Sequence, residues 1–136
     1  MRTVLTLVAI GGALGAITRF LVSNYALKVW GASFPFGTLI VNTIGTFLAL
    51  FFITIAAQKS AIFANINFAA INYENARLLF VVGFLGALTT FSSFGLETIA
   101  LFQNAQYIKG VLNVLLNNFC ALSAGVLGLA SARAIC

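Results

Sequence analysis

The sequence contains little charge. Only 7% of its 136 residues are charged and 62% are hydrophobic, whereas a soluble domain carries roughly 25% charged residues. So few charges cannot cover a water-facing surface, and the mean hydropathy of +1.10 agrees with this. A soluble domain is therefore excluded, and we expect an integral membrane protein.

Other missing residue types exclude several kinds of site. There is no histidine, so neither a histidine-ligated metal nor a histidine proton relay can form. The two cysteines, Cys120 and Cys136, are not spaced as metal ligands, and we expect no disulfide between them. No nucleophile, base and orienting group form an enzymatic constellation. The net charge of +5 comes from basic residues scattered singly between apolar runs, which leaves no patch for nucleic acid.

Four apolar runs are present, and each is near the ~20 residues that a helix needs to cross ~30 Å of hydrocarbon. They cover residues 4–22, 37–57, 78–102 and 111–132. The first run is too long for a signal-peptide core, contains Arg19 and is followed by three more, so we interpret it as a true span. The sequence therefore predicts an all-α membrane protein with four transmembrane helices in a single domain, residues 1–136.

Two features concern how these helices are connected and packed. The long connection 58–77 has apolar residues on one helical face, so it forms either a short helix on the membrane surface or a plain loop. The small-xxx-small spacing that lets helix backbones approach occurs at Gly11 and Gly15 and at Ala121 and Gly125. The predicted contacts lie within one chain or between two chains. Four helices make a thin bundle, which favours a dimer.

Charge counting leaves the orientation in the membrane open. With four spans, both termini and the connection 58–77 share one side. That side carries four basic residues, against two on the other side, or three if Arg19 reaches it. This is a weak positive-inside bias, and it is compatible both with a single orientation and with insertion in both directions.

Polar side chains inside the spans recur on single helix faces. The three faces are Thr38, Asn42 and Thr46; Thr90, Ser93 and Glu97; and Asn113, Asn117 and Cys120. Each polar residue either forms an interhelical hydrogen bond, worth about 1 kcal/mol, or lines a polar track through the bundle. Three such faces on three helices favour polar tracks. On the fourth helix Asn117 is the main candidate to line such a track, and Asn113 and Ser123 are secondary candidates.

The third run holds an unusual polar cluster at 83–94, where four hydroxyl side chains and two glycines surround Phe91 and Phe94. Unpaired polar groups are costly in hydrocarbon, so this cluster predicts an interior that it lines. The positive edge of an aromatic ring can stabilise a small anion weakly enough to let it leave, which suits conduction. Glycine, serine and threonine also favour a break in this helix, and the freed carbonyl oxygens could bind a cation.

Two ionisable residues, Arg19 and Glu97, fall within the predicted spans, where such residues are costly and usually functional. Arg19 either extends its charged end to the interface or attracts anions. Glu97 has three roles compatible with its position: it pairs with a cation, it hydrogen-bonds to nearby hydroxyl groups, or it carries a proton.

Three stretches form a familiar pattern: GFLGALTTFSSFGLE at 83–97, GGALGAITR at 11–19 and GTLIVN at 37–42. Together they closely resemble the motifs of the fluoride channel family, called Fluc or CrcB. The resemblance extends over the whole chain in length and helix count. It implies a fluoride-selective ion channel for passive fluoride efflux, which relieves cytoplasmic fluoride toxicity. It also implies an antiparallel, dual-topology homodimer with two pores in the cell (inner or plasma) membrane.

The same resemblance implies site residues. The paired phenylalanines of the family match Phe91 and Phe94, its pore asparagine matches Asn42, and sodium is implied as a structural ion that is not transported. This ion lies at the dimer centre, on main-chain carbonyls that match Gly86 and Thr89. With the polar faces and the matched first-helix arginine and third-helix glutamate, the predicted fluoride pore comprises Phe91, Phe94, Asn42, Ser92, Thr38, Glu97, Asn117 and Arg19.

Two other functions are compatible with the residues alone. A proton-coupled exporter of the small multidrug type also has four helices and can insert both ways. Such an exporter depends on a glutamate in its first helix, however, and the only charged residue in the first predicted span of this chain is Arg19. A structural membrane subunit without a transport role would use the polar faces for packing only.

Overall fold

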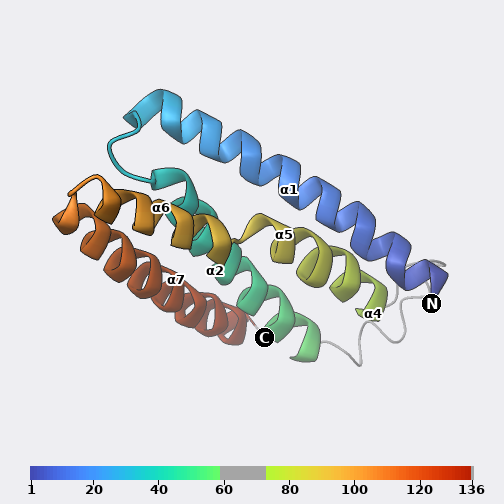
Figure 1. The fold of residues 1–136 in the computed structure, drawn as a ribbon. Helices are drawn as coiled ribbons and strands as arrows, with labels where there is room; N and C mark the ends of the chain where they lie inside the picture. The colour runs from blue at the N-terminus through green and yellow to red at the C-terminus, as the bar shows by residue number, and fades with distance from the viewer. Residues whose placement is uncertain (59–72, 136) are drawn as a thin grey trace.

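The computed structural model describes residues 1–58 and 73–135, and this part of the chain consists of helices and short connections. Figure 1 shows α1 (Arg2–Trp30) and α7 (Tyr107–Ile135) on opposite sides of the bundle. The helical segments of Tyr73–Gln103, which we call the third helical unit, lie between them. The elements are α1 (Arg2–Trp30), α2 (Phe36–Gln58), α4 (Tyr73–Ala76), η1 (Arg77–Leu85), α5 (Gly86–Leu88), α6 (Phe91–Gln103) and α7 (Tyr107–Ile135). The predicted connection 58–77 lies mostly outside the described residues.

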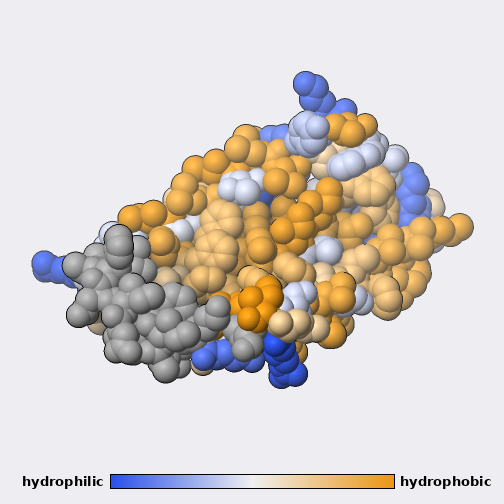
Figure 2. All heavy atoms as spheres, turned by 180° about the vertical axis from the view of Figure 1, so that it is seen from behind, coloured by the Kyte–Doolittle hydropathy of each residue, from blue (hydrophilic) through white to orange (hydrophobic). Residues whose placement is uncertain are grey.

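Within the described ranges, four helical units are long and apolar enough to cross a membrane: Arg2–Trp30, Phe36–Gln58, Tyr73–Gln103 and Tyr107–Ile135. This confirms the prediction of an all-helical chain with four spans. Large apolar side chains are exposed on these helices, and Figure 2 shows them over much of one face of the molecule. A surface of this kind is stable in lipid and not in water, so the chain is a multi-pass integral membrane protein.

α1 continues well beyond the first apolar run, to Trp30. It ends where Gly31 takes a positive φ of 72°, a conformation that glycine adopts without steric cost. α2 then begins at Phe36, directly after Pro35. Gly31 therefore sets the C-terminal end of α1 and Pro35 the N-terminal end of α2, and the limits of the apolar runs do not.

Glycines bring the helix backbones close together within the chain. A Cβ atom on Gly11 would overlap the carbonyl oxygen of Leu79, and one on Gly15 would overlap that of Phe84. The predicted small-xxx-small pair of the first helix therefore packs α1 against η1 of the same chain. On α7, a Cβ on Gly125 would lie 2.8 Å from Leu50 Cδ1, so this glycine faces α2.

The third helical unit changes its backbone conformation near the middle of the chain's membrane span. Its first part ends at Leu88, and Thr89 and Thr90 are extended, with ψ angles of 153° and 121°. α6 then begins at Phe91, and the Thr90 hydroxyl oxygen accepts the Ser93 backbone N–H at 3.1 Å. Two β-branched residues favour extended backbone, and threonine is a good N-cap, so the sequence accounts for this local conformation.

The two parts of this unit contact different neighbours. The part before Thr89 packs against α1, through both η1 and α5, whereas α6 packs against α7. α2 contacts elements of both groups, and its contact with α7 is the most extensive between any two described helices. The extended residues therefore lie between two packing groups.

Candidate functional site

A cavity of about 420 Å³ lies beside the extended residues, between α2, the third helical unit and α7. Its lining includes six of the residues predicted from the sequence: Asn42, Gly86, Thr89, Phe91, Phe94 and Asn117. Thr46, Thr90, Asn118, Ala121 and Leu122 complete it. Residues from three separate parts of the sequence thus meet at one place.

Asn42 binds the backbone of Thr90. Its Oδ1 accepts the Thr90 N–H at 2.8 Å, and its Nδ2 donates to the Thr90 carbonyl oxygen at 3.2 Å. Extended backbone inside a helix leaves such groups without helical partners, and unpaired backbone groups are costly in a membrane. The side-chain amide of Asn42 binds both backbone groups of Thr90, so it stabilises the extended conformation.

A chain of side-chain hydrogen bonds continues from Asn42 into α7. Asn42 Nδ2 donates to Asn117 Oδ1 at 3.1 Å, and Asn117 Nδ2 donates to Asn113 Oδ1 at 2.8 Å. Asn113, which is fully buried, donates to Thr98 Oγ1 at 2.9 Å. We call Asn42, Asn117, Asn113 and Thr98 the amide ladder. It connects α2, α7 and α6, so two of the polar faces predicted from the sequence meet here.

The two phenylalanines of the third-helix motif contact each other but differ in exposure. Their ring centroids lie 5.4 Å apart, with an angle of 55° between the ring planes. Phe94 is 9% exposed, whereas Phe91 is 82% exposed in the single chain. The two rings are tilted and do not stack face to face, and both residues line the cavity. The edges of aromatic rings carry partial positive charge.

Ser92 lies at the start of α6 and belongs to a hydroxyl cluster. Its Oγ is 3.1 Å from Thr90 Oγ1, which also donates to Ser93 Oγ at 3.2 Å. Ser92 itself does not line the 420 Å³ cavity. Ser92 is therefore connected to the predicted pore residue Asn42 indirectly, because Thr90 forms hydrogen bonds with both residues.

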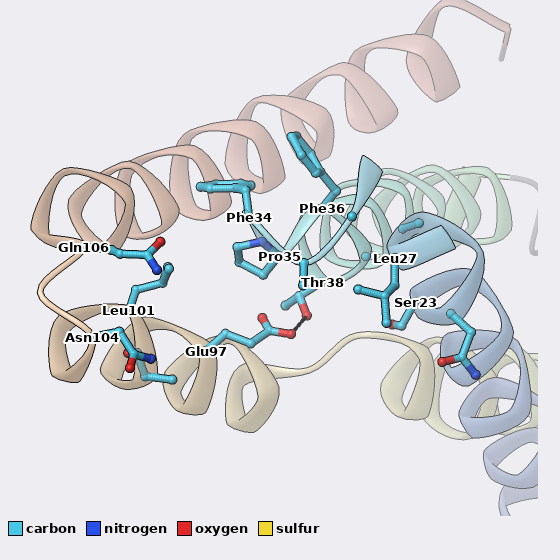
Figure 3. Close-up of a pocket in the computed structure, with 16 residues that line it drawn as sticks. Ser23, Leu27, Phe34, Pro35, Phe36, Thr38, Glu97, Leu101, Asn104 and Gln106 are labelled. Atoms are coloured by element: carbon cyan, nitrogen blue, oxygen red, sulfur yellow. Dashed lines mark hydrogen bonds between the residues drawn. The ribbon is translucent and has the colours of Figure 1, made fainter. Parts of the chain in front are cut away.

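Thr38 and Glu97 line a second cavity of about 380 Å³, between the end of α1, the start of α2 and α6. Thr38 Oγ1 donates to Glu97 Oε1 at 2.7 Å, and Figure 3 shows the carboxylate directed toward this hydroxyl. The other oxygen, Oε2, is buried and has no hydrogen-bond partner among the described residues. Of the three roles left open for Glu97, the structure shows hydrogen bonding to a hydroxyl group, and no ion pair to it occurs within the described ranges.

Arg19 stands apart from both cavities. It lies on α1, is half-buried and lines neither cavity. Within the described part of the chain it has no ion pair or hydrogen bond. The sequence grouped Arg19 with the pore residues, but the structure of the single chain does not bring it to them.

Two residues of the site were not singled out from the sequence as pore residues, Thr98 and Asn118. Thr98 ends the amide ladder, and its hydroxyl donates to the Phe94 carbonyl oxygen at 2.7 Å. Asn118 lines the 420 Å³ cavity beside Asn117. The available signal was the pair of adjacent asparagines in an apolar run, because such polarity is costly in a span.

Comparison with known proteins identifies the family. Residues 6–129 match the model of the family described as "CrcB-like protein, Camphor Resistance (CrcB)". The chain belongs to this CrcB-like family. Together with the names of the relatives below, this match confirms the resemblance to the fluoride channel family.

Two curated relatives that this CrcB-like chain resembles are both named "Fluoride-specific ion channel FluC". The relative from Legionella pneumophila (strain Paris) is 45% identical over 121 residues, which cover 89% of this chain and 83% of the relative. The relative from Shewanella sp. (strain ANA-3) is 45% identical over 113 residues, which cover 83% of this chain and 82% of the relative. The relatives are thus named as ion channels, which is not an enzymatic function.

Proposed function

We propose that this CrcB-like chain is a fluoride-selective channel that lets fluoride leave the cell passively and so lowers fluoride toxicity in the cytoplasm. The observation that carries the proposal is the meeting of Phe91, Phe94, Asn42 and Asn117 at one cavity within the spans. Fluoride is small and strongly hydrated, so a selective pore must replace water with hydroxyl, amide and ring-edge contacts. This cavity is lined by amide, hydroxyl and aromatic side chains, and the family's relatives bear the matching name.

The two cavities form one proposed route along α2. Thr38 and Asn42 are one helical turn apart, about 6 Å along the axis, and each lines one cavity. Thr38 and Glu97 belong to one end of this route, and Asn42, Asn117, Ser92 and the two rings to its middle. Arg19 contributes by attracting anions toward the membrane surface from α1.

The proposed assembly is an antiparallel, dual-topology homodimer with two pores, in the cell inner or plasma membrane. Phe91 supports it, because a ring that lines a cavity and is 82% exposed in the single chain is available to a second subunit. The weak charge bias between the two sides of the membrane is compatible with subunits in opposite orientations.

We also propose that the extended segment is the functional helix break of the family, with a structural sodium ion on the carbonyls of Gly86 and Thr89. In a continuous helix these carbonyls would accept from the N–H groups of Thr90 and Ser93. Those N–H groups instead donate to Asn42 Oδ1 and Thr90 Oγ1, at 2.8 and 3.1 Å. Carbonyl oxygens freed in this way fit a hard cation such as sodium, which prefers oxygen ligands.

Sodium is therefore expected to stabilise the purified protein. Binding to the folded state alone adds about 2.7 kcal/mol when the free ion is at 100 times its Kd. The thermal unfolding midpoint in detergent should rise with sodium chloride and not with choline chloride at equal ionic strength. An equal midpoint in the two salts would remove sodium from the proposal and leave the fluoride pathway untouched.

The central test is fluoride efflux from liposomes that contain the purified protein. The wild-type protein is expected to release fluoride and retain chloride. Phe91→Ile and Phe94→Ile should each slow fluoride release by roughly 2- to 12-fold, because the loss of a ring-edge contact is worth roughly 0.5–1.5 kcal/mol. Phe51→Ile is the matched control, since Phe51 stacks on Phe47 and lines neither cavity. Equal release of fluoride and chloride by the wild-type protein would contradict the proposed function.

A further inference from the structure

The amide groups at the 420 Å³ cavity differ in how many of their hydrogens are free. A side-chain amide has two N–H hydrogens. Those of Asn42 go to the Thr90 carbonyl oxygen and to Asn117 Oδ1. Those of Asn117 go to Asn113 Oδ1 at 2.8 Å and to the Asn113 carbonyl oxygen at 3.3 Å. Neither asparagine therefore has a spare donor for an anion.

The hydroxyl groups that line the same cavity are also committed as donors. Thr46 Oγ1 donates to the Asn42 carbonyl oxygen at 2.7 Å, and Thr89 Oγ1 donates to the Leu85 carbonyl oxygen at 3.0 Å. Thr90 Oγ1 donates to Ser93 Oγ at 3.2 Å. An anion that accepted a hydrogen bond from any of these groups would first have to displace an acceptor of the protein itself.

Asn118 is the exception among the polar side chains described at this cavity. Its Nδ2 donates one hydrogen bond, to the Val114 carbonyl oxygen at 2.7 Å, so its second N–H is uncommitted within the described residues. The side chain is exposed and lies on α7 inside a span. A half-satisfied amide at this depth is costly unless water, an ion or another polar group completes it.

We propose that Asn118 supplies the side-chain N–H that contacts fluoride in this cavity, while Asn42, Asn117 and Asn113 hold the helix backbone in place. The inference rests on the proposed fluoride conduction and assigns a division of labour within it. Fluoride has no hydrogen to donate, so it requires a donor, and Asn118 offers one without breaking a bond of the protein. Asn42 and Asn117, expected from the sequence to line the pore as contacts, act as positioning residues.

The test compares three substitutions at Asn118 in the liposome efflux assay. Asn118→Leu removes the donor. In Asn118→Ser the single hydroxyl bonds back to the carbonyl oxygen four residues earlier, so polarity stays but no donor is spare. Asn118→Gln keeps a spare N–H. We expect Asn118→Leu and Asn118→Ser each to slow fluoride release by roughly 10- to 100-fold at low fluoride concentration, as for one lost hydrogen bond to a charged group. The Gln variant should retain most of the rate.

The control is Thr54→Val. Thr54 is a half-buried polar residue of α2 whose hydroxyl likewise donates to the carbonyl oxygen four residues earlier, and it lines neither cavity. If Asn118→Leu does not yield folded protein, the comparison of Ser with Gln decides the matter alone. Equal fluoride efflux rates for Asn118→Ser and Asn118→Gln, or a wild-type rate for Asn118→Leu, would overturn the role of Asn118. The proposed function fails separately, if the wild-type protein itself does not release fluoride.

Discussion

Replacing Asn42 with leucine is expected to slow fluoride efflux by about 30-fold or more and to destabilise the protein. The substitution removes both hydrogen bonds to the Thr90 backbone and the bond to Asn117. Thr90 is 6% exposed, so water cannot replace the lost partners. Each buried unsatisfied group costs roughly 1–3 kcal/mol, and a tenfold change in rate corresponds to about 1.4 kcal/mol. Two such groups therefore account for the expected loss.

The measurement combines liposome efflux with thermal unfolding in detergent. Thr18→Val provides a control, because Thr18 forms a single back-bond of 2.8 Å to the Leu14 carbonyl oxygen on α1, away from both cavities. It should match the wild-type protein in both measurements. If Asn42→Leu kept the wild-type efflux rate and unfolding midpoint, Asn42 would not stabilise the extended segment.

Replacing Gly15 with valine is expected to disrupt the packing of α1 on η1. The new side chain would overlap the backbone carbonyl of Phe84, and no rotamer change can move a backbone atom out of the way. We expect a loss of about 3 kcal/mol or more, at the upper end for overpacked sites. The measurements are the yield of monodisperse protein in detergent and its unfolding midpoint.

Gly12→Val is the matched control for Gly15→Val. Gly12 lies on the same helix, but a Cβ there would meet no atom within 4 Å. Replacing a helix glycine at an open position should be neutral or slightly stabilising, since glycine is a poor helix former. Equal behaviour of the two valine variants would mean that α1 does not pack on η1 through Gly15.

The hydropathy of the sequence was sufficient to predict the four spans, because the apolar runs are long and charges are rare. Helical spacing also placed Thr38, Asn42 and Thr46 correctly on one face of α2. Spacing cannot say which other helix that face meets, however. Thr38 binds Glu97 at one cavity and Asn42 binds Thr90 at another, so one face serves two sites.

Arg19 and Asn118 also show that sequence patterns do not predict which helices pack together. Arg19 was grouped with the pore by likeness of motif, yet α1 packs against η1 and leaves Arg19 outside both cavities. Asn118 follows Asn117 directly, so it projects about 100° away around the helix and falls outside the predicted face. Its place at the cavity depends on how α7 packs on α2, which no local pattern records.

The extended residues Thr89 and Thr90 also affect how the third helical unit can bend. The part of the third unit before them packs on α1, and α6 packs on α7, so a displacement of either neighbour would carry its part of the unit with it. The Thr89 N–H still donates to the Leu85 carbonyl oxygen at 3.0 Å, but the Thr90 N–H donates to Asn42 Oδ1, so the helical hydrogen-bond pattern is interrupted after Thr89. A tilt of α1 relative to α7 would therefore change the backbone angles mainly at Thr89 and Thr90. The hydrogen bonds from the Asn42 side chain to the Thr90 backbone would oppose this bending.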